Sequence, residues 1–214
     1  MIYWLLSVLT ALIAYGFGCL DSIVLASNFI FRRNLRRLGK STVFVSNFWR
    51  VYGWKGSVKL FLAELVLDLL PILIGGWLFG IKDQAAVGRA LAGFCLVMGR
   101  MWPATNELRG GHGVLAMVFA AFGVDTSLGI AVLLVTVGAA AFSRRVSVGA
   151  LFGVAVMLIV TLLVVDGALV TRLAMLTAAA VTARHLPAIF RLARGTEPRL
   201  NFEKDITYKL DEKF

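Results

Sequence analysis

Charged residues are scarce in this sequence of 214 residues. Asp, Glu, Lys and Arg together make up 16%, whereas apolar residues make up 59%, and the mean hydropathy is +0.85. A water-soluble domain carries roughly 25% charged residues and shows amphipathic periodicity. We therefore expect the chain to lie in a bilayer, which excludes a soluble enzyme, a nucleic-acid-binding protein and a secreted scaffold held by disulfides.

Cysteine and histidine are also rare. Cys19 and Cys95 both lie inside apolar runs, where we expect packing rather than a disulfide. His112 and His185 are the only histidines, and no pair of Cys or His residues has the spacing of metal ligands. The sequence therefore predicts neither a metal site nor a bound cofactor.

Seven apolar segments along the chain are candidate membrane spans. They lie at about 2–30, 58–80, 84–98, 113–124, 126–142, 148–165 and 168–186. The segment 113–124 is the weakest, since it reaches only about 18 Å as a helix, and we expect it to be tilted, kinked or buried among its neighbours. The predicted fold class is all-α, a polytopic membrane protein with seven transmembrane helices.

Basic residues are concentrated on one side of this arrangement. If alternate loops face the cytoplasm, that side holds the segments 31–59, 99–112, 143–147 and 184–214. Of the 22 Lys and Arg residues, only Lys82, Arg89 and Arg172 then lie on the other side. For a protein with an odd number of spans, the N-terminus outside and the C-terminus in the cytoplasm, the positive-inside rule predicts this asymmetry. We expect one membrane domain over 1–197 and a polar cytoplasmic tail over 198–214.

The first predicted cytoplasmic loop is rich in cations and hydroxyl groups. Residues 35–50 include Gly39, Lys40, Asn47 and Arg50, and no carboxylate lies among them. A segment of this composition suits an anionic ligand.

The second predicted loop ends in glycines directly before an apolar segment. Arg109 is followed by Gly110, Gly111, His112 and Gly113. Consecutive glycines let successive backbone N–H groups turn toward an anion, and the helix N-terminus that follows adds partial positive charge. The alternative is a flexible hinge where the loop enters the membrane, and the sequence alone favours neither.

Two further cytoplasmic elements carry basic residues. The short loop 143–147 contains Arg144, Arg145 and Ser147, which either bind an anion or anchor the loop on the cytoplasmic side. His185 lies at the end of the last apolar segment, where a histidine either caps the helix, extends its ring toward the membrane surface, or takes part in catalysis.

Carboxylates inside apolar segments are costly and indicate a functional site or a buried ion pair. Asp21 lies in the first apolar run, and Glu64 and Asp68 share one face of the second. We expect these carboxylates to pair with basic residues of the first cytoplasmic loop. The alternative is a proton or cation path of a small transporter.

The order and spacing of these elements resemble the membrane acyl-phosphate:glycerol-3-phosphate acyltransferases of bacteria, the PlsY type, over nearly the whole chain. The family's first motif, approximately L/I-R-x-x-G-S-G-N-x-G-A-T-N-x-x-R-x-x-G, lies on residues 35–53 without a gap. The second motif, G-H-x-x-P-x-x-x-x-x-K-G-G-K-G, lies on 99–113, and an R-x-V-S pattern lies on 144–147. The third motif, R-H-x-x-N-I-x-R-L-x-x-G-x-E, lies on 184–197.

The chain departs from these motifs at several positions. The replacements are Lys40 for Ser, Thr42 for Asn, Phe44 and Val45 for Gly-Ala, Glu64 for Asp, Leu67 and Asp68 for Lys-Gly, Arg100 for His, Arg109 and His112 for Lys, and Ala188 for Asn. The resemblance therefore leaves two interpretations open. The chain either carries out the family's reaction at an altered site, or it is an inactive relative that acts as a partner subunit or a lipid-binding regulator.

The first interpretation implies an enzyme of phospholipid synthesis in the bacterial inner membrane, with its site on the cytoplasmic side. It would move an acyl chain from acyl phosphate to glycerol 3-phosphate and give lysophosphatidic acid. Such a site must hold two anionic substrates together with cations and N–H donors. The resemblance implies catalytic roles for His185, Asn47 and Arg50. It implies substrate or phosphate binding by Gly39, Lys40, Arg109, Gly110, Gly111, His112, Gly113, Arg144, Arg145 and Ser147.

Overall fold

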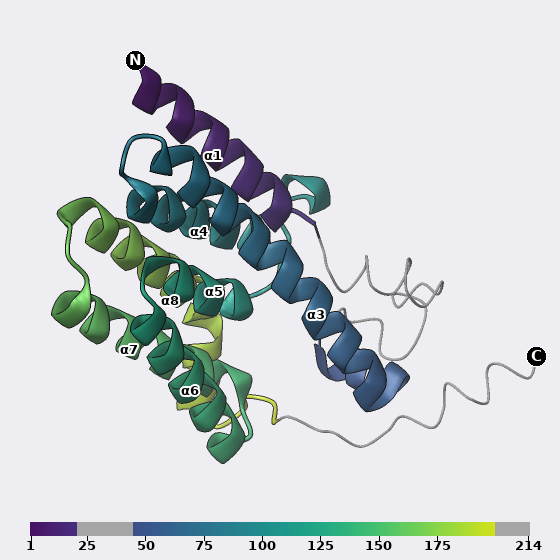
Figure 1. The fold of residues 1–214 in the computed structure, drawn as a ribbon. Helices are drawn as coiled ribbons and strands as arrows, with labels where there is room; N and C mark the ends of the chain where they lie inside the picture. Colours follow the sequence, from purple (N-terminus) through teal and green to yellow (C-terminus); the bar gives the residue numbers. More distant parts are fainter. Residues whose placement is uncertain (21–44, 200–214) are drawn as a thin grey trace, which may run out of the picture. The chain divides into compact units, whose positions relative to one another are not determined.

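All regular structure in the described residues is helical. A computed structural model describes residues 1–20 and 45–199, with side chains from residue 54 onward in the second range. Its elements are α1 (Ile2–Gly18), α3 (Val45–Gly80), α4 (Ala85–Met101), the short 3-10 helix η3 (Ala104–Asn106), α5 (Val114–Val124), α6 (Thr126–Ser143), α7 (Val146–Val164) and α8 (Ala168–Ala193), as Figure 1 shows. The predicted all-α class is confirmed for this part of the chain.

The helices occupy the predicted apolar segments. Three of them, α6, α7 and α8, are long and apolar enough to cross a membrane, and α1 and α5 are shorter apolar helices. The 11 residues of α5 are mostly buried, and α5 packs against α4, α6 and α8. The prediction that this weakest segment lies among its neighbours is therefore confirmed.

Several helix ends differ from the predicted boundaries. The second apolar segment was expected to begin near residue 58, after a cytoplasmic loop, but α3 already begins at Val45. The first apolar run was expected to continue to Ile30, but α1 ends at Gly18. Glycine has low helix propensity, and the Cys19 and Leu20 amides close the last turn on Tyr15 and Phe17. The remainder of the run, with Asp21, lies outside the described residues. At the other end of the chain, α8 continues through Pro187 to Ala193.

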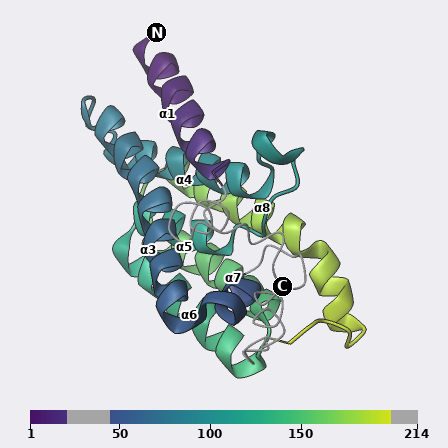
Figure 2. The same ribbon diagram turned by 90° about the vertical axis from the view of Figure 1, so that its right-hand side faces the viewer.

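The chain divides into two units. One unit comprises residues 1–20 and 67–199. Within it α1 packs on α4, α4 packs on α5 and α8, and α7 lies between α6 and α8 (Figure 2). The other unit comprises 21–66 and 200–214, of which the structure describes the first part of α3.

An aspartate separates α5 from α6. The Asp125 side chain accepts hydrogen bonds from the amides of Ser127, at 2.8 Å, and Leu128, at 3.0 Å. This N-cap satisfies backbone donors that the first turn of α6 leaves without a helical partner. The apolar run is thereby cut into a short α5 and a long α6.

Glycines let the helix backbones approach closely. A Cβ added at Gly88 of α4 would overlap the Gly75 carbonyl of α3 and lie 2.7 Å from the Phe79 Cβ. A Cβ at Gly149 of α7 would overlap the Thr136 carbonyl of α6. Small residues at such contacts permit the van der Waals packing on which helix association in lipid depends.

Arg89 connects α4 to the end of α5. Its Nε donates to the Gly123 carbonyl at 2.8 Å. A guanidinium at this position satisfies a terminal carbonyl and complements the partial negative charge of the helix end. One of the three cations that lie outside the basic loops therefore has a structural role.

Gly88→Ala is expected to lower the melting temperature of the purified protein in detergent. The added Cβ overpacks the contact between α3 and α4, which costs about 1–3 kcal/mol. The matched control is Gly138→Ala on α6, where an added Cβ meets no atom within 4 Å and alanine favours the helix by about 0.5–1 kcal/mol. Equal melting temperatures for the two variants would contradict the close contact.

Candidate functional site

The loop between α4 and α5 is attached to the end of α1. The Tyr15 hydroxyl donates to the Trp102 carbonyl at 2.8 Å, and the Thr105 hydroxyl donates to the Cys19 carbonyl at 2.9 Å. These bonds hold the start of the loop over the C-terminal end of α1. The loop therefore begins from a fixed position.

The loop then turns back toward α4. Glu107 and Leu108 have positive φ angles of 50° and 60°, a left-handed turn that non-glycine residues rarely adopt. Gly111 N–H donates to the Arg100 carbonyl at 3.0 Å, and a Cβ at Gly110 would overlap that same carbonyl. The double glycine thus allows the loop to return to the end of α4. Of the two interpretations of this glycine segment, the anion site would turn the Gly111 amide toward a ligand, whereas here it bonds to the last turn of α4.

Arg184 of α8 holds the double-glycine turn, Gly110–Gly111, from its other side. Its Nη2 donates to the Gly110 carbonyl at 2.7 Å and its Nε donates to the Gly111 carbonyl at 3.1 Å. Its guanidinium carbon lies 6.0 Å from the centre of the Trp102 ring, within cation–π range. Arg184 was not among the predicted site residues, although it is the first residue of the third family motif.

His185 is buried at the point where Arg184 meets the loop. The residue is 1% exposed, and its Nδ1 lies 2.8 Å from the Val181 carbonyl. Because a carbonyl only accepts, Nδ1 carries the proton, and Nε2 of the neutral ring is the acceptor. The His112 ring lies 5.1 Å from the His185 ring, measured between centroids. The structure therefore brings together two histidines predicted from separate segments.

The surroundings of His112 favour its neutral form. Burial lowers the pKa of His112 from its ordinary value of 6.5. Repulsion from His185 in its protonated form and from the Arg184 and Arg191 guanidinium groups lowers the pKa of His112 further, and the Glu197 carboxylate opposes them. An anion bound among these cations would raise the pKa again. Anion binding and proton uptake at His112 are therefore linked.

Gly113 begins the helix that follows His112. It is the N-cap of α5, and its φ of 69° lies in the left-handed region that favours glycine. The first amides of α5 therefore start directly after His112. Their partial positive charge adds to that of the cations nearby.

Glu197 joins the start of α7 to the end of α8. Its carboxylate is buried and accepts hydrogen bonds from the Ser147 hydroxyl and, at 2.6 Å, from Arg191 Nε. Burial raises the pKa of Glu197, but the bonds from Arg191 and Ser147 outweigh this, so the pKa lies below its usual value. Ser147, a predicted phosphate ligand, therefore gives its only hydroxyl proton to Glu197.

The other predicted phosphate-binding arginines are placed differently from one another. The Arg109 side chain is 83% exposed and lies 4.0 Å from Glu107. Arg144 is exposed at the end of α6. Arg145 is half-buried, and its Nε is buried without a hydrogen-bond partner among the described residues. Of the three, Arg145 is therefore the best placed to receive an oxyanion.

The remaining predicted site residues lie where side chains are not described. Gly39 and Lys40 are outside the described residues. Asn47 and Arg50 fall in the helical backbone of the first part of α3, without described side chains. Their roles stay predictions. In the ranges 1–20 and 54–199, no group of three His, Cys, Asp or Glu residues is arranged to hold a metal ion.

A buried ion pair adjoins the double-glycine turn. Arg100, whose carbonyl holds Gly111, donates to Asp68 Oδ1 from Nη2 at 2.6 Å and from Nε at 3.1 Å. Asp68 is completely buried in α3, and Arg100 Nη1 also donates to the Leu20 carbonyl after α1. The partner that the structure shows for Asp68 therefore belongs to α4. The loop that was expected to supply this partner lies largely outside the described residues.

Known proteins resemble this chain over almost its full length. The family model described as glycerol-3-phosphate acyltransferase matches residues 8–195. The glycerol-3-phosphate acyltransferase of Thermoanaerobacter pseudethanolicus is 26% identical over 200 residues, which cover 94% of this chain and 98% of that protein. That of an Anaeromyxobacter species is 29% identical over 203 residues, with 88% and 95% covered.

A solved structure shares the fold. The glycerol 3-phosphate form of PlsY, an integral membrane glycerol 3-phosphate acyltransferase, matches with a TM-score of 0.73 at 23% identity over 97% of this chain and 98% of that one. The form with lysophosphatidic acid gives the same TM-score and identity over 92% and 96%.

Asp68→Leu is expected to destabilise the protein more than the double variant Asp68→Leu/Arg100→Met. The single change leaves the Arg100 guanidinium buried without its counter-ion, which costs about 3–5 kcal/mol, whereas apolar replacement of both members of a buried pair is often tolerated. Thermal unfolding in detergent measures the difference, with Arg109→Met as the exposed control. A double variant no more stable than Asp68→Leu would show that the pair does not act as a unit.

Proposed function

Because the chain belongs to the glycerol-3-phosphate acyltransferase family, we propose that it transfers an acyl chain from an acyl phosphate to glycerol 3-phosphate and forms lysophosphatidic acid. The chain is a multi-pass membrane protein, with apolar helices and the fold of an integral membrane protein. The proposal includes seven spans in the bacterial inner membrane, with the N-terminus outside and the site on the cytoplasmic side. The asymmetry of Lys and Arg supports this orientation.

The convergence of the double-glycine turn and the end of α8 carries the proposal. The His112 and His185 rings lie side by side, and Arg184 binds both glycine carbonyls. Arg191 lies near enough to lower the pKa of His112. Two phosphate-bearing substrates repel each other, so a site that holds both must supply positive charge from several elements. This end of the bundle supplies it.

His185 is assigned to proton transfer. In the reaction a bond forms between the glycerol hydroxyl oxygen and the acyl carbon, and the bond from the acyl carbon to the phosphate oxygen breaks. His185 Nε2 accepts the hydroxyl proton, and the Val181 carbonyl holds Nδ1–H so that the ring keeps its orientation. The proton then passes to the leaving phosphate. An acyl phosphate is already activated, so no acyl-enzyme is needed.

His112 and Arg145 are assigned to phosphate binding. Anion binding stabilises the charged form of His112, and Arg145 has a buried Nε without a partner among the described residues. Arg184 positions the turn rather than the substrate, because two of its donors are taken by Gly110 and Gly111. Asn47 and Arg50 stay in the proposal as catalytic residues on the strength of the family resemblance. The remaining predicted phosphate-binding residues stay with them on the same ground, and these are Gly39, Lys40, Arg109 and Arg144.

Turnover by the purified protein in detergent tests the function. With palmitoyl phosphate and glycerol 3-phosphate supplied, the expected result is release of phosphate together with lysophosphatidic acid. His185→Asn is expected to lower kcat by roughly 10²–10⁴-fold, the usual contribution of a general acid or base. Arg194→Ala, an exposed position at the end of the same helix, is expected to retain the activity. Melting temperatures confirm that both variants are folded.

Absence of turnover above a control without enzyme would contradict the proposal. That result would favour the second candidate function, an inactive relative of the family that acts as a partner subunit or a lipid-binding regulator. That candidate has one structural observation in its favour, since Ala188 lies buried one turn from His185 where the family motif has Asn.

The pH dependence of KM tests the assignment of His112. Its lowered pKa means that substrate binding draws a proton onto the ring, so KM for glycerol 3-phosphate is expected to fall as the pH falls from 8 to 6. His112→Lys places a permanent charge there and should remove this contribution. Titration of the substrate's own phosphate affects both proteins equally. The ratio of wild-type to variant KM is therefore expected to be larger at pH 8 than at pH 6, and a constant ratio would exclude the assignment.

A further inference from the structure

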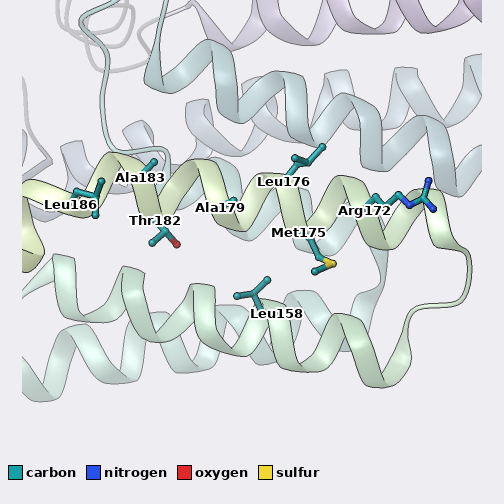
Figure 3. Close-up of a pocket in the computed structure, with 8 residues that line it drawn as sticks. All are labelled: Leu158, Arg172, Met175, Leu176, Ala179, Thr182, Ala183 and Leu186. Atoms are coloured by element: carbon teal, nitrogen blue, oxygen red, sulfur yellow. The ribbon is translucent and has the colours of Figure 1, made fainter.

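A groove of about 800 Å³ runs along α8 beside α7. Its lining residues are Leu158, Arg172, Met175, Leu176, Ala179, Thr182, Ala183 and Leu186. Figure 3 shows Met175 and Thr182 directed toward α7, and Leu158 of α7 directed back toward α8. The two alanines leave the groove hollow near its middle. The surface is almost entirely apolar, with Arg172 at one end.

The groove is separate from the candidate active site. The residues that α8 buries in the bundle include Thr177, Val181, His185 and Ala188. With 3.6 residues per turn, these lie on the opposite face of α8 from Ala179 and the other lining residues. The groove therefore faces outward, and a ligand in it does not occupy the site of the proposed reaction.

Arg172 is the only charged residue in the groove. Its side chain is exposed, and within the described ranges it forms no hydrogen bond or ion pair. Arg89, by contrast, is bonded to the Gly123 carbonyl. Arg172 lies about one turn after the start of α8 at Ala168, which places it close to one surface of the membrane. A guanidinium there is well suited to bind a phosphate through two parallel N–H bonds.

The length of the groove fits one acyl chain. From Arg172 to Leu186 the helix rises by about 21 Å, at 1.5 Å per residue. One leaflet contributes about half of a hydrocarbon core of about 30 Å. A chain that starts at a headgroup beside Arg172 therefore finds apolar surface over the whole depth of its leaflet.

We propose that Arg172 and this groove bind one phospholipid, with its phosphate on Arg172 and an acyl chain between α7 and α8. The positive charge at the end of this open apolar groove matches a ligand with a phosphate at one end and a hydrocarbon chain at the other. The bound lipid contacts both α7 and α8, so it stabilises their packing. The site does not depend on the proposed acyltransferase activity.

Lipid binding to the full chain in neutral detergent tests the site. Native mass spectrometry measures the number and affinity of bound lipids, and thermal unfolding measures their effect on stability. Phosphatidylglycerol is expected to bind with one retained molecule per chain and to raise the melting temperature. Diacylglycerol with the same chains lacks the phosphate and is expected to bind at least tenfold more weakly, and inorganic phosphate alone is expected to have no effect. Equal effects of phosphatidylglycerol and diacylglycerol, or stabilisation by phosphate alone, would overturn the proposal.

Two variants test the contact with the lipid phosphate and the contact with the acyl chain separately. Arg172→Gln removes the phosphate contact and Ala179→Phe fills the groove, and each is expected to lower the affinity for phosphatidylglycerol at least tenfold. Both positions face outward, so the fold should persist, and the melting temperature without lipid verifies this. The controls are Lys82→Gln, which removes an exposed charge elsewhere, and Val137→Phe, which adds the same ring at an exposed position of α6. Unchanged affinity in either groove variant, or an equal loss in its control, would refute the site.

Discussion

The architecture of the candidate site depends on the two hydrogen bonds that Arg184 donates to the Gly110 and Gly111 carbonyls. Each carbonyl would otherwise meet the end of α8 without a partner, and the loop would have no fixed relation to that helix. With the bonds formed, His112 is held against His185. A loop between α4 and α5 and a helix more than 70 residues later thereby form one cationic surface.

On the α4 side, the double-glycine turn is supported by the buried ion pair of Arg100 and Asp68. The Arg100 carbonyl holds Gly111, while the Arg100 side chain is fixed by the buried carboxylate of Asp68. Both residues stand where the family motifs have a different residue, and in this chain they contact each other. We interpret them as coupled replacements, since either charge alone would be costly at this depth. The two replacements together therefore keep Arg100 in the position from which its carbonyl binds Gly111.

Much of the fold follows from the sequence, because lipid requires apolar helices and their lengths can be counted. The short α5 was predictable from the length of its apolar segment, whereas its burial was one of three alternatives that this length left open. The helix ends at Gly18 and Ala193 were not, because terminal hydrogen bonds rather than hydropathy determine them. In the site, the meeting of the glycine loop with His185 follows from the family resemblance, which implies that both belong to one site. The roles of Arg184 and Glu197 do not follow in this way, since the third motif contains both residues but does not show the tertiary hydrogen bonds on which each role depends.

The proposed function requires that the double-glycine turn and the end of α8 form the pocket that binds the substrate phosphate. The most direct test is an experimental structure of this protein with glycerol 3-phosphate bound. We expect the phosphate oxygens to lie within about 3 Å of nitrogen donors of His112 or Arg145, with the glycerol hydroxyl groups directed toward His185 Nε2. A phosphate bound away from both residues, with the two histidines facing empty solvent or lipid, would contradict it.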